Sequence, residues 1–232
     1  MSLVRAVAWL AVRELWISFR LITVIALFLL AGALIALLPS VGRGQPAGWY
    51  AIGLGVASMG AGALTAGVLS AERRRGTAAW LVSRAVPRVT LLVGWFIALL
   101  GATLVGFVPG AALAWLRILP AAPVLDAGRF AIAVLAVGGG ALAALALGMV
   151  AGALLPPRRA SLFTLLLCAA FAAGALALPA ARSLTPASGY FLLAEVPNDW
   201  PLGRALQSIG IGLASAALLL TAAGLALERA DL

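Results

Sequence analysis

The sequence predicts an all-helical integral membrane protein with six transmembrane helices, and three observations support this prediction. Hydrophobic residues make up 64% of the chain and charged residues 10%, whereas soluble domains contain about 45–50% apolar and about 25% charged residues. The mean hydropathy is +1.14. The apolar residues also gather into segments close to the ~20 residues that cross a bilayer as a helix. A water-soluble fold could not bury this much apolar surface, so we expect lipid to surround the chain.

The spans are expected at 21–38, 49–70, 89–108, 130–154, 161–179 and 204–226. In the third, apolar sequence continues to Leu119, but Pro109 lacks a backbone donor and is expected to kink or end the helix. The first apolar run exceeds the ~7–15 residues of a signal-peptide core, so we expect it to be retained. Residues 1–232 are predicted to form a single transmembrane domain with no soluble domain attached.

The arginines predict the orientation of the chain. All 16 basic residues are Arg. If the N-terminus is cytoplasmic, 11 of them fall on the cytoplasmic side and five on the other. The exclusive use of Arg favours a GC-rich bacterial genome and hence a bacterial inner (plasma) membrane. The asymmetry of the arginines follows the positive-inside rule and predicts a multi-pass protein with both termini in the cytoplasm. It also explains the basic excess without a nucleic-acid partner.

Several missing residue types exclude classes of enzyme. The chain has no Lys and no His, and Cys168 is its single cysteine. It therefore cannot form a Walker-type ATP site, a His-Glu-x-x-His zinc site, a Ser-His dyad or a Lys Schiff base. Gly55, Ser58 and Gly60 do not form the Gly-x-Ser-x-Gly motif, which disfavours an intramembrane enzyme. We expect no catalytic residue, no metal ligand and no cofactor in this chain.

Residues 1–20 are predicted to form an interfacial helix. At 100° per residue, arginines and tryptophans alternate along one stripe, which consists of Arg5, Trp9, Arg13, Trp16 and Arg20. Arg and Trp are the residues expected at the level of lipid headgroups. The stretch is then either an extension of the first span or an in-plane helix that also touches a cytoplasmic partner.

The loop after the second span, residues 71–88, is the most informative segment. It begins with a cluster of positive charge, Arg73–Arg75, and Gly76 is expected to end the preceding helix. Thr77 can cap a short new helix whose exposed face carries Trp80 and Leu81. A loop that only sets topology does not need an exposed tryptophan, so this apolar face favours docking to another protein. The candidate docking residues are Glu72, Arg73, Arg74, Arg75, Gly76, Thr77, Trp80, Leu81, Ser83, Arg84, Pro87 and Arg88.

Residues 180–203 form a second unusual segment, on the outer side. Thr185 followed by Pro186 is a good helix start, and the residues after it are too apolar for a free loop. We expect a short helix at or partly in the outer interface. Two carboxylates could bind an outer partner or a cation, or be solvated beside Arg204. The candidate residues are Tyr190, Phe191, Glu195, Asp199 and Trp200.

The predicted spans contain no ionisable residue clearly inside them, which argues against a proton-driven secondary transporter. Small residues are abundant and include the pairs Gly106/Gly110 and Gly148/Gly152. Such surfaces allow helices to pack closely and make a dimer feasible.

The loop 71–88 resembles the loop after the second span in permeases of the ABC-2 type exporter family. The shared pattern is Glu-x-x-x-Gly-Thr, a short Leu-containing helix and Ser-Arg-x-x-Pro-Arg. The matching positions are Glu72, Gly76, Thr77, Leu81, Ser83, Pro87 and Arg88. The usual family form is closer to Leu-Leu-x-x-Pro-x-x-Arg, from which Val82 and Arg84 depart. Six spans, an in-plane N-terminal helix and the charged tail 226–232 extend the resemblance over almost the whole chain.

The resemblance implies the membrane subunit of an ATP-driven exporter. Two such subunits, identical or sister chains, would form the transport path, and a separate ATPase carrying ATP and Mg²⁺ would dock on each through a coupling helix in the loop 71–88. Short re-entrant helices would shield the outer exit, where an accessory protein could complete the system. Two alternatives stay open, a stand-alone secondary transporter or channel and, within the family, a haem-exporter-type permease.

Overall fold

The computed structural model describes residues 3–37, 45–75, 86–121, 126–178, 182–195 and 202–229, and all the regular structure in these ranges is helical. The helices are α1 (Leu3–Ile17), α2 (Arg20–Leu37), α3 (Gln45–Arg75), α5 (Arg88–Ala121), α6 (Ala127–Leu154), α7 (Pro157–Ala177), α9 (Ser188–Glu195) and α10 (Leu202–Arg229). Six of them are long and apolar enough to cross a membrane, namely α2, α3, α5, α6, α7 and α10. The chain is therefore an all-helical, multi-pass membrane protein.

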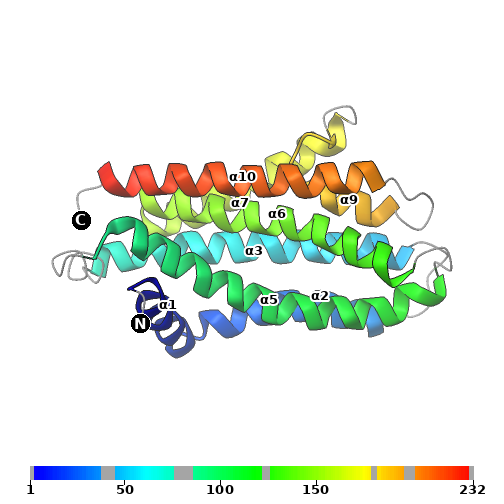
Figure 1. The fold of residues 1–232 in the computed structure, drawn as a ribbon, viewed down its shortest axis with the longest axis horizontal. Helices are drawn as coiled ribbons and strands as arrows, with labels where there is room; N and C mark the ends of the chain where they lie inside the picture. Colours follow the sequence, from blue (N-terminus) through cyan, green and yellow to red (C-terminus); the bar gives the residue numbers. More distant parts are fainter. Residues whose placement is uncertain are drawn as a thin grey trace.

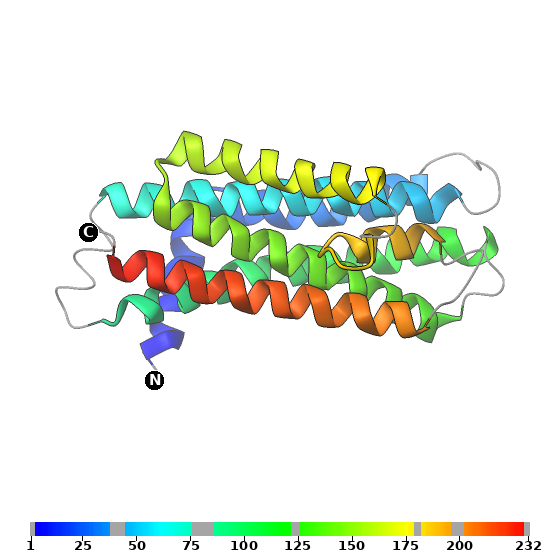
Figure 2. The same cartoon turned by 90° about the horizontal axis from the view of Figure 1, so that it is seen from above.

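The six long helices lie side by side along one axis of the molecule (Figure 1). Helix α1 runs across that axis at one end of the bundle, and α10 finishes at the same end (Figures 1 and 2). We call this end, which carries α1, the N-terminal end. Helix α9 lies at the opposite end, which we call the far end.

Helix α6 is the centre of the bundle, because α3 and α10 both pack against it. In its most apolar stretch 67% of residues are buried, compared with 17% in α7 and in α10. Glycines allow this close packing. A Cβ on Gly62 of α3 would lie 2.6 Å from the carbonyl oxygen of Ala144, and a Cβ on Gly212 of α10 would lie 2.6 Å from the Cα of Gly139. The pair Gly148/Gly152 also faces α3, so helices of the same chain cover it.

Helices α2 and α5 form a second closely packed pair. A Cβ on Gly110 of α5 would lie 2.5 Å from the carbonyl oxygen of Phe28 in α2. Nearby, the rings of Phe28 and Phe107 meet edge to face, with centroids 5.8 Å apart. The pair Gly106/Gly110 thus packs against a helix of the same chain, as the pair Gly148/Gly152 does.

Of the two outcomes expected at Pro109, a kink or the end of the helix, the second does not occur. Helix α5 continues through Pro109 to Ala121 and has 34 residues. A proline removes a single backbone hydrogen bond, and neighbouring helices stabilise such a site within a membrane; here the glycines beside Pro109 pack on α2. At 1.5 Å per residue α5 is about 50 Å long, more than the ~30 Å hydrocarbon core. Arg117, expected in a loop, therefore lies on α5 near its far end.

Candidate functional site

The beginning of the predicted docking loop is fixed to the end of α6. The Nη1 atom of Arg73 donates to the carbonyl oxygens of Ala153 and of Gly152, the latter at 3.3 Å. One turn earlier, the Ser70 hydroxyl donates to the carbonyl of Leu155. The last carbonyls of a helix have no partner within the helix and carry partial negative charge, so a guanidinium group stabilises them. The C-terminal ends of α3 and α6 are thus joined by side chains.

The end of the loop is fixed to α10 in the same manner. The Nη1 atom of Arg88, the first residue of α5, donates to the carbonyl oxygens of Leu227 and Glu228 at 2.9 and 2.8 Å. These two residues belong to the last turn of α10. Both described ends of the loop therefore hold a helix C-terminus through an arginine.

Helix α1 is packed against the same region. Val7 of α1, Val86 of the loop and Leu91 of α5 form a small buried apolar cluster. The two helices approach closely at Gly94, where a Cβ would lie 2.6 Å from Cγ1 of Val7. A displacement of the end of the loop would therefore also displace α1.

The remaining predicted docking residues differ in their surroundings. Glu72 is buried, whereas Arg74 and Pro87 are exposed. The structure does not describe the side chain of Arg75. The central part of the loop lies outside the described residues, and with it the predicted residues Gly76, Thr77, Trp80, Leu81, Ser83 and Arg84.

Helix α1 is amphipathic, as the sequence predicts. Its buried face consists of Val7, Ala11 and Leu15. At 100° per residue, the predicted Arg and Trp stripe lies on the opposite face, where Trp9 and Trp16 are 68% and 57% exposed. Arg20 does not belong to this helix. The chain turns after Ile17, with Phe19 at a positive φ of 58°, and Arg20 begins α2.

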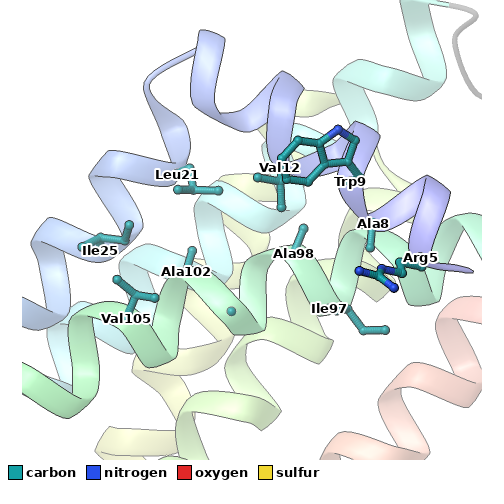
Figure 3. A pocket seen from close by; sticks show the side chains of 11 residues that line it. Arg5, Ala8, Trp9, Val12, Leu21, Ile25, Ile97, Ala98, Ala102 and Val105 are labelled. Atoms are coloured by element: carbon teal, nitrogen blue, oxygen red, sulfur yellow. The ribbon is translucent and has the colours of Figure 1, made fainter.

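A groove of about 590 Å³ runs between α1, α2 and α5. Figure 3 shows Trp9 and Val12 of α1 over one side of it, with Ala98 and Ala102 of α5 beneath. Arg5 lies at one end and is the one charged residue of its lining. The rest of the groove is apolar, so it fits hydrocarbon better than a polar solute.

The short helix expected within residues 180–203, α9, packs against α3, α6 and α10. Tyr190 of α9 reaches the Ser58 hydroxyl of α3, and its ring would be 2.8 Å from a Cβ placed on Gly140 of α6. The Ser188 hydroxyl at the start of α9 shares a buried hydrogen bond with Ser208 of α10. Three spans therefore hold α9.

The helix α9 begins at Ser188, three residues after the predicted start at Thr185, because the Thr185 hydroxyl donates to the carbonyl of Arg182 in a preceding turn. Arg182 organises this end of the molecule.

Arg182 pairs with Glu195 at 3.2 Å and lies over the ring of Phe191 at 4.6 Å. It also donates to the carbonyl of Ala175 near the end of α7. Arg204 is 3.8 Å from the other Glu195 oxygen. These ion pairs leave Glu195 less suited to binding a free cation than the sequence suggests. Asp199 and Trp200 lie outside the described residues.

Within the described ranges there is no group of three His, Cys, Asp or Glu side chains that could hold a metal ion. The hydroxyl of Ser58, the candidate nucleophile of the disfavoured enzyme, donates to the Leu54 carbonyl at 2.8 Å. No sequence pattern selects Arg182 or the Ser188–Ser208 pair in advance, since isolated Arg and Ser residues carry no pattern. No protein-family model and no curated protein sequence matches the chain.

Proposed function

We propose that this chain is the membrane subunit of an ABC-2 type exporter. It pairs with a second subunit, identical or a sister chain, and each subunit docks a separate ATPase on the N-terminal end of the bundle, which faces the cytoplasm. The observation that carries the proposal is the attachment of the docking loop, through Arg73 and Arg88, to the C-terminal ends of α6 and α10. A partner that moves the loop pulls directly on two spans.

The packing gives a path for this movement to the far end. Helix α6 is the central helix, and both α10 and α9 pack against it. Helix α9 is held by Gly140 of α6, Ser58 of α3 and Ser208 of α10. A shift of α6 relative to α10 changes the contacts that hold α9. Helix α9 closes the far end of the transport path when the two ATPases are apart, and it opens the far end when the ATPases come together.

The polar groups inside the bundle also favour a transport path whose energy comes from a separate protein. The serine and threonine hydroxyls of the spans bond mainly to backbone carbonyls, as Thr65 does to Ala61 and Thr164 does to Ala160. A transporter driven by protons usually holds ionisable side chains at this depth. An external ATPase supplies the energy without them.

The proposal is tested by co-expressing the tagged chain with the P-loop ATPase encoded beside it and measuring co-purification and ATPase activity in nanodiscs. Trp80→Glu is expected to abolish co-purification, because a charge on the docking face opposes apolar contact. Trp49→Glu is the matched control, since Trp49 is 51% exposed at the far end of α3. It should leave the complex intact.

Two outcomes would contradict the proposal. The first is a folded chain that never binds an ATPase, which would favour the stand-alone transporter or channel. The second is equal loss of the complex with Trp80→Glu and Trp49→Glu, because the loop would then have no special part in docking.

A further inference from the structure

A second groove, separate from the one under α1, lies between α2, α3 and α7 at the N-terminal end of the bundle. Its volume is about 500 Å³, within the ~300–1,000 Å³ typical of small-molecule sites. Two arginines line it, Arg20 from the start of α2 and Arg158 from the start of α7. The described residues that line it include no acidic side chain.

The groove is polar at one end and apolar along its length. The arginines, together with Ala71 near the end of α3, lie where the helices leave the bundle. Leu64 and Leu162 line its deeper part. Leu64 precedes Ala71 by seven residues, which is about 10 Å along a helix. The groove therefore passes from headgroup level into the hydrocarbon level of a membrane.

The guanidinium groups of Arg20 and Arg158 differ in their surroundings from those of the other arginines at this end of the bundle. In the part of the chain that the structure describes, neither Arg20 nor Arg158 makes a hydrogen bond or an ion pair. By contrast, Arg73 and Arg88 at the same end are bonded to helix termini. Ser161, the polar residue between the helices, already donates its hydroxyl to the Ala63 carbonyl at 2.8 Å. The groove thus offers two free positive charges and no competing negative charge.

We propose that this groove binds one anionic phospholipid, with its phosphate between Arg20 and Arg158 and an acyl chain along Leu64 and Leu162. Charge complementarity selects the headgroup, since basic pockets between transmembrane helices at the cytoplasmic surface bind anionic lipid headgroups. The apolar walls select a lipid over a soluble phosphate. The site does not depend on whether an ATPase docks on the chain.

Native mass spectrometry of the full chain in detergent tests the site, with dioleoyl phosphatidylglycerol and dioleoyl phosphatidylcholine at equal concentrations. One Arg near the membrane surface contributes about 5-fold to binding an anionic lipid. The wild-type chain should then prefer phosphatidylglycerol over phosphatidylcholine by about 25-fold. The double variant Arg20→Gln with Arg158→Gln should reduce this preference to about 2-fold or less.

The matched control is Arg13→Gln with Arg159→Gln. It removes the same charge from the same end of the bundle, and both side chains are exposed and outside the groove. The control should keep the preference. A second variant, Ala71→Phe, fills the groove while keeping both arginines, and should lower binding of both lipids about 5-fold or more. If the arginine variant fails to fold, the Ala71→Phe variant still tests whether the groove binds the lipid.

Four results would overturn the proposal. These are no preference in the wild-type chain, a preference that survives the groove variants, equal loss in the control, and displacement of the lipid by equimolar inorganic phosphate. Equal loss would mean a diffuse surface charge, and displacement would mean a site for soluble phosphate.

Discussion

Arg73 and Arg74 are adjacent and carry the same charge, yet their side chains have different contacts. The Nη1 atom of Arg73 donates to two carbonyls at the end of α6, whereas Arg74 is exposed. We therefore expect Arg73→Ala to destabilise the fold and Arg74→Ala to leave it unchanged. The pair is a matched comparison, because each variant removes one guanidinium group from the same turn of α3.

The size of the effect follows from the contacts. A hydrogen bond to a charged group contributes about 1.5–3 kcal/mol, and a cation at a helix C-terminus adds about 0.3–1 kcal/mol. The two acceptors share one nitrogen, so we count a single bond, and we take the lower values because Arg73 is only partly buried. This gives a loss of about 2 kcal/mol. In a chain of this size it corresponds to a decrease of about 4–8 °C in Tm.

The assay is thermal unfolding in detergent, followed by far-UV circular dichroism. Arg73→Ala should lower the Tm by the stated amount, and Arg74→Ala should shift it by about 1 °C or less. Equal shifts for the two variants would refute the assignment of Arg73 as the cap of α6. ATPase co-purification then separates the roles further, since Arg74→Ala should weaken docking without changing the Tm.

Two other predictions concern packing inside the bundle. Gly148→Ala should lower the free energy of unfolding by about 1–3 kcal/mol, because its Cβ would overlap the carbonyl oxygen of Gly62 and lie 3.0 Å from Cβ of Thr65, both in α3. Gly138→Ala on the same helix meets nothing within 4 Å and should raise the free energy of unfolding by up to about 1 kcal/mol. The reverse order of Tm values would contradict the α3–α6 packing. Ser188→Ala and Ser208→Ala should each lower the free energy of unfolding by about 1–2 kcal/mol, since each leaves one buried hydroxyl without its partner. The double variant should lower it no more than either single variant does. Strictly additive losses in Tm would show that the two hydroxyls do not interact.

The six spans could be predicted because composition alone forces the chain into lipid. The length of α5 could not, since Pro109 carries the same local signal whether or not a neighbouring helix supports it. Here α2 supports it, by packing on the glycines beside the proline. Local sequence describes what a residue prefers, and distant segments decide whether that preference is met.

The candidate sites show the same limit. The segment Ser188–Glu195 predicts a short apolar helix near the outer interface, but its eight residues do not reveal which spans surround them. Its packing depends on Gly140 of α6 and Ser208 of α10, both far away in the sequence. Likewise, Arg73 and Arg74 differ only in their angular position relative to α6.

The contacts also separate the consequences of the two arginines at the ends of the docking loop. Helices α1 and α2 both pack on α5, and α6 packs with α3, α9 and α10; α2 and α3 join these two groups, whereas α5 has few contacts with α6 or α10. Arg73 joins α3 to α6, two helices of the same group. Arg88 joins α5 to the end of α10 and so connects the two groups at the N-terminal end. Under the proposed function, a moving loop would act on α6 through Arg73 and on α10 through Arg88, and the Arg88 bond is the one of the two that links the groups.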